Sequence, residues 1–287
     1  MASRTPPVKT LVKLLLVGLS IATALSFCGL RMVGRLSPPG SHRTLPGLSP
    51  EDPSEDLGQV LVPVDTPPGR AVTYVWNVEE LTPQRQQVAY GLGERLEAQI
   101  EATHHAYARR LRYRALGPGR FTYVAPPGCG TDMHCIYLEL MRTSPGPVRA
   151  LGERFAASIR TRQLDAAQAA QLILGFVQRI RYEVPDNEPF GIVPPALVPA
   201  QNRGDCDSKA VLAVMLLRQV GIDAVLLYSD PLAHAAVGVG LPGSGTRLKL
   251  GGRSYQYAEV TAEGWPPGMV PPRYNLLHLW KVLPLEE

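Results

Sequence analysis

Hydrophobic residues in the middle of the chain recur every three or four positions, which is the spacing of one helix face. The longest such pattern covers residues 82–111 and predicts an amphipathic helix that begins at a Thr-Pro pair. Two shorter patterns predict helices over 147–162 and 165–180, and Asp165 is suited to cap the second of these. The middle of the chain is therefore expected to be rich in helices.

Other hydrophobic runs alternate with polar residues or are too short for helices, and they predict β-strands. A Gly251-Gly252 pair before the last of these runs predicts a hairpin turn. The predicted strands are 71–76, 119–124, 136–141, 222–228, 234–241 and 255–261. Helices followed by hairpin-connected strands indicate an α+β fold.

The first 35 residues have the composition of a membrane-targeting segment. Three cations precede Leu14–Leu30, a stretch of 17 residues without a charge, which is at the lower limit for crossing a bilayer. The basic start predicts a single-pass inner-membrane protein whose body lies in the periplasm. Cleavage near Ala22-Thr23-Ala24 and lipidation at Cys28 are the alternatives.

Composition changes again after this segment. Residues 36–70 contain eight prolines and no sustained periodicity, so they are expected to form an extended linker. An N-terminal, helix-rich α+β extension (71–164) and a C-terminal domain (165–287) complete the predicted organisation.

The formal net charge of +4 comes from the segment 1–35, which holds five basic and no acidic residues, and the remainder has a net charge of −1. A nearly neutral body gives no electrostatic reason to bind nucleic acid.

Two of the four cysteines lie close together in the sequence. Cys129 and Cys135 are six positions apart in a glycine-rich loop, and in an oxidising compartment they are predicted to form a disulfide. Zinc binding by this pair together with His134 is the alternative, but the spacing matches no common zinc site. Cys206 is then left as the free thiol of the body.

Cys206 lies where a buried helix is predicted to begin. Residues 204–221 read GDCDSKAVLAVMLLRQVG, with apolar residues at helical spacing and a glycine that ends the helix. Unpaired backbone N–H groups at a helix start stabilise a thiolate, which is the nucleophilic form of cysteine. The alternative, a small buried apolar residue, fits poorly beside Asp205 and Asp207.

Two further polar residues are expected near this helix. His234 begins the apolar strand 234–241, and Glu259 lies on the returning strand, on one face with Tyr255 and Tyr257. A buried carboxylate needs a partner, and the histidine on the neighbouring strand is the obvious candidate. For His234 the alternative is a core histidine whose hydrogen bonds are satisfied.

The order of these residues resembles the transglutaminase-like superfamily and, more narrowly, bacterial transglutaminase-like cysteine peptidases. The similarity covers about residues 165–270 and is most specific at the Gly-Asp-Cys-Asp motif. Its segments are FVQRIRY (176–182), NRGDCDSKAVLAVMLLRQVGIDAVLL (202–227), HAAVGVG (234–240) and YAEVTAEGW (257–265). The resemblance implies a papain-like core in which the nucleophile helix packs on an antiparallel sheet.

The resemblance also implies a role for each of three residues. Cys206 matches the nucleophile, His234 the general base, and Glu259 the acid that orients the imidazole, where many members have Asp. The expected oxyanion donor is the backbone N–H of Cys206, with Tyr182 or Asn202 as candidates for a second. No cofactor is required, and calcium at the two aspartates beside the cysteine is an alternative to helix capping.

The predicted function is an envelope-facing thiol hydrolase that cleaves peptide or amide bonds of a protein or peptide substrate. One alternative is transfer of a glutamine amide to an amine by the same three residues. The other is a catalytically silent domain that binds a partner. The membrane is expected to be contacted only through the N-terminal segment, and no nucleic acid is expected as a partner.

Overall fold

The computed structural model describes residues 9–12, 53–64, 70–117, 120–129 and 133–285. The uncharged stretch 14–30 of the predicted membrane segment, including the alternative sites of cleavage and lipidation, and most of the predicted linker lie outside these ranges. Within them, every helix is too short or too polar to cross a bilayer. The predicted α+β class is confirmed by the helices and largely antiparallel sheets.

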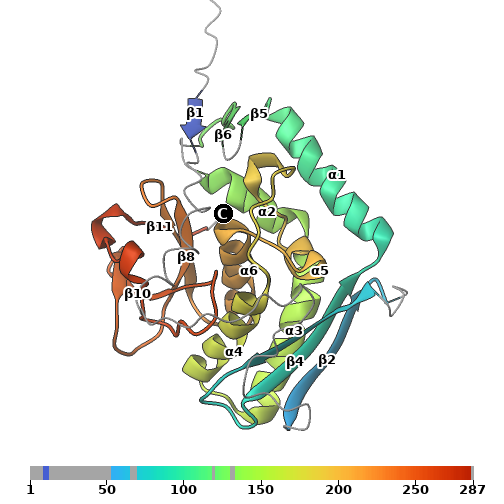
Figure 1. Ribbon diagram of the computed structural model, residues 1–287, viewed down its shortest axis with the longest axis vertical. Helices are drawn as coiled ribbons and strands as arrows, with labels where there is room; N and C mark the ends of the chain where they lie inside the picture. The colour runs from blue at the N-terminus through green and yellow to red at the C-terminus, as the bar shows by residue number, and fades with distance from the viewer. Residues whose placement is uncertain (1–8, 13–52, 65–69, 118–119, 130–132, 286–287) are drawn as a thin grey trace, which may run out of the picture.

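A five-stranded antiparallel sheet occupies the C-terminal part of the chain. Its strands are β7 (Ala224–Ser229), β8 (His234–Val239), β9 (Arg247–Leu250), β10 (Arg253–Ala258) and β11 (Lys281–Leu283). They lie in the order β11-β7-β8-β10-β9, in orange and red in Figure 1. Strands β7 and β8 are buried along their whole length, which explains their continuous apolar sequences. The predicted hairpin is confirmed, because Gly251 and Gly252 connect β9 to β10 with φ angles of 54° and 79°.

A buried helix packs on this sheet and is covered by two others. The three are α3 (Pro145–Arg162), α4 (Ala166–Arg179) and α6 (Cys206–Gln219). Helix α6 contacts β7 and β8, and it also contacts α3 and α4. All its residues from Cys206 to Leu217 are buried, as expected of a helix that is enclosed on every side. The predicted cap of α4 is confirmed, since Asp165 accepts a hydrogen bond from the backbone N–H of Gln168 at 2.9 Å.

A three-stranded sheet packs against α3 and α4. Its strands are β2 (Ser54–Val62), β3 (Val72–Asn77) and β4 (Arg85–Leu92). Strand β4 lies in the middle, parallel to β2 and antiparallel to β3. Residues 54–62 had been assigned to the extended linker, and that part of the prediction is wrong. Pairing with β4 orders this stretch, since Leu57 and Val60 are buried there.

The helix predicted over 82–111 is wrong in its first part, because helix α1 (Glu94–Arg110) begins only after β4. Val88 and Leu92 are four residues apart, a spacing that fits one helical turn and also two repeats of a strand. Burial along β4 alternates, with Gln86, Val88 and Tyr90 buried between partly exposed neighbours. The sequence pattern was therefore ambiguous, and pairing with two neighbouring strands decided it.

The strand predicted at 136–141 is also wrong, because helix α2 (His134–Thr143) covers it. Its buried residues Ile136, Tyr137 and Leu140 lie on one helix face, but a six-residue apolar run does not separate the two structures. The strand predicted at 119–124 is confirmed as β6. The remaining elements are β1 (Lys9–Val12), β5 (Arg114–Gly117), β6 (Arg120–Tyr123), η2 (Pro189–Gly191), α5 (Leu197–Gln201), η3 (Pro272–Tyr274) and η4 (Leu277–Leu279).

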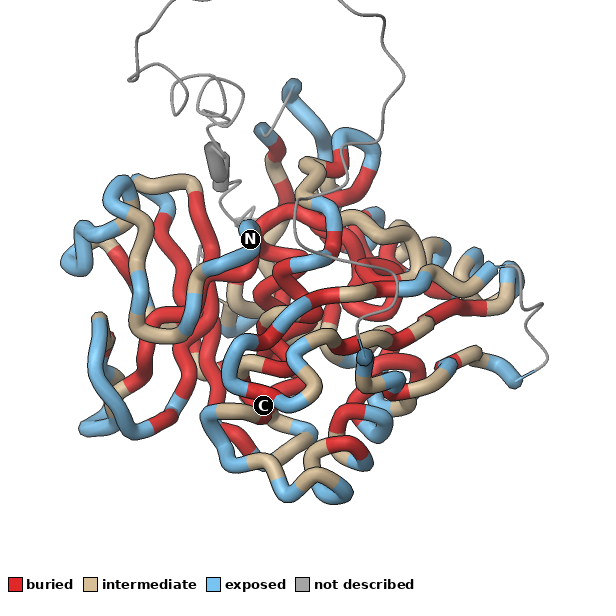
Figure 2. Tube along the Cα trace, turned by 60° about the horizontal axis from the view of Figure 1, so that its bottom comes forward, coloured by how far each residue is buried: buried red, intermediate tan, exposed pale blue. Residues whose placement is uncertain are grey.

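One hydrophobic core joins the two halves of the described chain. The same cluster of buried side chains includes residues of β2, β3 and β4 and residues of α4, α6 and β8, and the buried segments meet at the centre of Figure 2. Polar contacts cross the same region. Trp76 donates from Nε1 to the carbonyl of Leu172 at 3.1 Å, and the Tyr74 hydroxyl donates to the carbonyl of Pro199 at 2.5 Å. The domain boundary predicted at 164/165 stays a prediction, but residues on both sides of it share this core.

Candidate active site

Cys206 is the first residue of α6, and only 6% of its surface is exposed. The preceding residue, Asp205, caps the helix: its Oδ1 accepts from the backbone N–H of Ser208 at 2.9 Å and from the Ser208 hydroxyl at 2.6 Å. Gly204 forms a short parallel bridge with Tyr182, which fixes the chain where it enters the helix. The sulfur therefore lies at a helix N-terminus, where backbone N–H groups favour negative charge.

His234 is the first residue of β8 and is 4% exposed. Its Nε2 lies 3.0 Å from Oε2 of Glu259, a residue just beyond the end of β10. Strands β8 and β10 are neighbours in the sheet, as predicted, so the pair is held by strand pairing. One face of the imidazole is covered by Tyr274, whose ring is stacked at a centroid distance of 3.8 Å and an interplanar angle of 9°.

Glu259 is 1% exposed and accepts hydrogen bonds on both carboxylate oxygens. Oε2 accepts from His234 and from the Tyr257 hydroxyl at 2.8 Å. Oε1 accepts from the backbone N–H groups of Val260 at 3.0 Å and Thr261 at 2.9 Å, and from the Thr261 hydroxyl at 2.7 Å. Burial alone would raise the pKa of this carboxyl, but the hydrogen bonds from His234 and Thr261 hold the pKa at about 2. Glu259 is thus ionised at neutral pH, and the His234 Nε2–H is the donor in their contact.

The two tyrosines that contact this pair, Tyr274 and Tyr257, both have raised pKa values. Burial is the largest cause for Tyr274, and together with interactions with Glu259 and Cys206 it raises the pKa to about 12 against the opposing effect of Arg273. Burial also raises the pKa of Tyr257, again with contributions from Glu259 and Cys206. Helix α6, which begins with Cys206, packs on β8, which begins with His234, and this packing brings the two elements of the candidate site together.

The aromatic residues beside the imidazole, Tyr274 and Trp280, were not predicted from the sequence. Trp280 donates from Nε1 to the carbonyl of Tyr274 at 2.9 Å and lies edge-on to Tyr257 at 5.4 Å. The guanidinium of Arg273 lies over the outer face of Tyr274 at 4.6 Å. The only signal in the sequence was the density of aromatic residues in a segment rich in proline, which does not specify which ring meets His234.

Asp207 is the second acid beside the nucleophile. The Cys206 thiol donates to its Oδ1 at 3.6 Å, and Asp207 is 1% exposed. One ligand atom from each of Asp205, Cys206 and Asp207 lies within 4.8 Å of the others. Helix capping already occupies Oδ1 of Asp205, in agreement with the interpretation preferred from the sequence. Calcium binding here stays an untested alternative.

The two candidates for a second oxyanion donor have different surroundings. Asn202 ends α5 in a left-handed conformation with φ 48°, and its Oδ1 accepts from the backbone N–H of Arg181 at 3.2 Å. The Asn202 side chain therefore stabilises the turn after α5, as one of the two interpretations of this residue expects. Burial raises the pKa of the Tyr182 hydroxyl, and the next largest cause is the charge of Cys206. Tyr182 is also paired with Gly204, two residues before Cys206, so its backbone is fixed beside the start of α6.

Cys129 and Cys135 form a disulfide at the start of α2. Their sulfur atoms are bonded to each other and are not zinc thiolates. Helix α2 packs on α6, and its fully buried Tyr137 has a pKa raised by burial and, next, by the charge of Asp207. The disulfide thus anchors a helix that borders the nucleophile.

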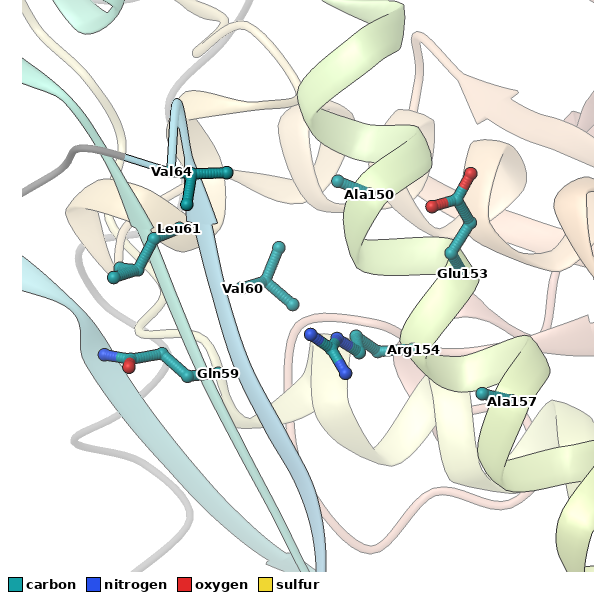
Figure 3. A pocket seen from close by; sticks show the side chains of 8 residues that line it. All are labelled: Gln59, Val60, Leu61, Val64, Ala150, Glu153, Arg154 and Ala157. Carbon is teal, nitrogen blue, oxygen red and sulfur yellow. The ribbon is translucent and has the colours of Figure 1, made fainter.

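Hollows on the described surface include two that differ in their relation to the candidate site. One, of about 510 Å³, is lined by residues of β3 and of the segments 178–182 and 261–263, so it borders Tyr182 and Thr261. The other, of about 470 Å³, separates β2 from α3, and Figure 3 shows Arg154 extending from α3 toward Val60. The second hollow contains none of the candidate site residues. The first one is lined by both oxyanion candidates, Tyr182 and Asn202, but by none of Cys206, His234 and Glu259.

A cysteine at the tip of a buried helix, packed on an antiparallel sheet that carries a histidine–carboxylate pair, has the arrangement of a thiol hydrolase or transferase. A family model described as the transglutaminase-like superfamily matches residues 153–246, which include Cys206 and His234. The superfamily resemblance is therefore confirmed, while the narrower likeness to bacterial cysteine peptidases stays a prediction. No curated protein and no solved structure gave a significant match.

Proposed function

We propose that this protein is a thiol hydrolase that cleaves peptide or amide bonds through Cys206, His234 and Glu259. The observation that carries the proposal is the buried contact of 3.0 Å between His234 and an ionised Glu259, in the environment of a helix-tip cysteine. An ionised carboxylate beside the imidazole can orient the ring and stabilise the imidazolium that forms when a thiol is deprotonated, which is the role that the proposal gives to Glu259.

The proposed reaction follows from which nitrogen of His234 is already used. Nε2–H donates to Glu259, so Nδ1 is the nitrogen left to accept the thiol proton of Cys206. The thiolate attacks the substrate carbonyl carbon, and the backbone N–H of Cys206 stabilises the oxyanion. The imidazolium then returns the proton to the leaving amine as the C–N bond breaks. Water hydrolyses the resulting thioester, with His234 as the base, and the free thiol is restored.

An amine in place of water would give the alternative product, a transferred glutamine amide. The proposed place of action is the periplasm, with the chain anchored in the inner membrane by its N-terminal segment. The disulfide between Cys129 and Cys135 supports an oxidising compartment. The proposed substrate is a protein or peptide of the cell envelope.

The direct test is alkylation of Cys206 with iodoacetamide over a range of pH, read by peptide mass spectrometry so that other cysteines do not interfere. A thiolate paired with imidazolium reacts well below the ordinary thiol pKa of about 8.5. We expect His234→Ala to move the onset of alkylation up toward that value. The matched control is His278→Ala, which removes an exposed histidine and is expected to change nothing.

A wild-type profile that rises only near the ordinary thiol pKa, and is the same in His234→Ala, would refute the enzyme and favour the silent binding domain. Hydrolysis and transfer are separated by comparing envelope proteins of cells that carry the wild type or Cys206→Ala. New chain termini that require the cysteine support hydrolysis, whereas isopeptide-linked products support transfer.

A further inference from the structure

A fully buried lysine lies one helical turn after the nucleophile. Lys209 of α6 is 0% exposed, and lysine is among the residues that are almost never fully buried unless paired. Residues three apart on a helix share a face, so Lys209 follows Cys206 along the same side of α6. Burial lowers the pKa of this amine to about 7, while the charges of Glu259 and Glu263 act in the opposite direction. A residue held in this way at an energetic cost calls for a reason.

The partners of Lys209 are backbone carbonyls at the end of another helix. Nζ donates to the carbonyl of Gln178 at 3.2 Å and to that of Ile180 at 2.6 Å. These carbonyls lie in the last turn and at the cap of α4, where intrahelical partners run out and the helix dipole is negative. Lys209 therefore fastens the C-terminal end of α4 to the helix that carries the nucleophile.

The end of α4 in turn holds the segment of the acid. The side chain of Gln178 donates from Nε2 to the carbonyl of Glu259 at 2.9 Å and to the carbonyl of Trp265 at 2.9 Å. The backbone carbonyl of Gln178 accepts from Lys209, and the side-chain amide of Gln178 donates to the backbone carbonyl of Glu259. A continuous set of polar contacts thus runs from α6 through α4 to the residue that orients His234.

We propose that Lys209 is a positioning residue of the site, acting through Gln178 to set the main chain of Glu259 relative to Cys206. This inference rests on the proposed function, because it assigns Lys209 to the alignment of the same three residues. The distance between the Cys206 sulfur and the His234 ring depends on how α6 packs on the sheet. The Lys209–Gln178 contact holds α6 to the end of α4, and Gln178 in turn holds the main chain of Glu259. Small misplacements of reacting groups reduce rates strongly.

The test compares Lys209→Met with the control Lys249→Met in the full-length chain, where Lys249 is an exposed residue of β9. Folding is first verified by circular dichroism, and alkylation of Cys206 is then measured at about pH 6 and about pH 10, below and above the ordinary thiol pKa. We expect Lys209→Met to lower the rate at the lower pH by about tenfold and to leave the rate at the higher pH unchanged. Lys249→Met should match the wild type at both.

A role limited to stability would leave the alkylation profile of the folded protein unchanged, and this result would overturn the proposal. The double variant Lys209→Met/His234→Ala sharpens the test, because a residue that acts through the imidazole adds no further loss once the imidazole is gone. Should Lys209→Met fail to fold, Gln178→Met removes the other half of the link and is held to the same expected loss. If the wild type itself shows an ordinary thiol profile, the proposed function fails instead, and the two failures are distinguished.

Discussion

Two histidines are buried in the part of the chain that the structure describes, and their surroundings differ. His104 of α1 is 1% exposed, and its Nε2 lies 3.2 Å from the carbonyl of Pro189. Burial is the main cause that lowers its pKa to about 4, and the hydrogen bond to the Pro189 carbonyl acts in the opposite direction. His234 is about as buried, but its partner is the ionised carboxylate of Glu259.

The difference separates a structural imidazole from the one that we propose as the general base. A backbone carbonyl fixes the orientation of His104 but adds too little charge to make a buried imidazolium favourable, so this ring stays neutral at physiological pH. A carboxylate supplies a full negative charge and can stabilise the imidazolium that forms when a thiol is deprotonated. Burial of a histidine is therefore uninformative by itself, and the charge of its partner decides its chemistry.

The strongest test of this comparison is removal of the charge from the partner of His234. Glu259→Gln keeps the shape of the side chain but lets the imidazole adopt the wrong tautomer, so we expect alkylation of Cys206 at about pH 6 to fall by about 100-fold or more. Glu153→Gln, an exposed acid on α3, is the control. An unchanged rate in folded Glu259→Gln would remove the distinction between the two histidines.

Substitution of the other histidine should show the opposite result. We expect His104→Leu to lower the free energy of unfolding by about 1–3 kcal/mol, because a buried hydrogen bond to Pro189 is lost. The alkylation profile of the folded variant should remain that of the wild type. Urea unfolding measures the first effect, and a shifted alkylation profile would show that His104 contributes to the site after all.

Acid titration gives the most specific test of the two pKa values. His104 has a folded pKa lowered from 6.5 to about 4, so the unfolded chain binds the extra proton and stability falls as the pH drops through this window. Glu259 has a folded pKa lowered from 4.5 to about 2, so its contribution is complete above 4.5 and is lost as the pH drops toward 2. We expect His104→Leu to flatten the stability curve in the upper window and Glu259→Gln in the lower one.

These two windows can be followed by urea midpoints at a series of pH values. The slope attributable to one proton is about 1.4 kcal/mol per pH unit, which exceeds the usual error of such a series. Equal slopes in wild type and His104→Leu between pH 6.5 and 4 would contradict the assignment of that pKa.

The sequence was most informative where pattern and motif agreed. The start of α6 at Cys206, the hairpin at Gly251-Gly252 and the cap at Asp165 follow from local chemistry that leaves a trace in the sequence. Strand β4 and helix α2 were assigned wrongly because their apolar spacings fit both helix and strand. Only the neighbours available in three dimensions resolve that ambiguity.

The candidate site was predictable in part for the same reason. Cys206, His234 and Glu259 lie at ends of elements and were found from order and resemblance. Lys209 and Tyr274 were not found, because their partners are backbone carbonyls and the face of a ring. Every residue has a backbone carbonyl, so the amino-acid sequence does not show which residue accepts a hydrogen bond from Lys209.

The core shared by the two halves of the chain has a practical consequence. The side chains of Tyr74 and Trp76 on β3 pack against α5 and α4, where they bind the carbonyls of Pro199 and Leu172. The packing is close, because a Cβ on Gly175 would come within 2.7 Å of the Trp76 ring. A fragment that begins at residue 165 would lack β2, β3 and β4, and the apolar faces of the helices that pack against them would be exposed to water. We therefore expect such a fragment to aggregate, whereas a chain that keeps β2, β3 and β4 should stay folded.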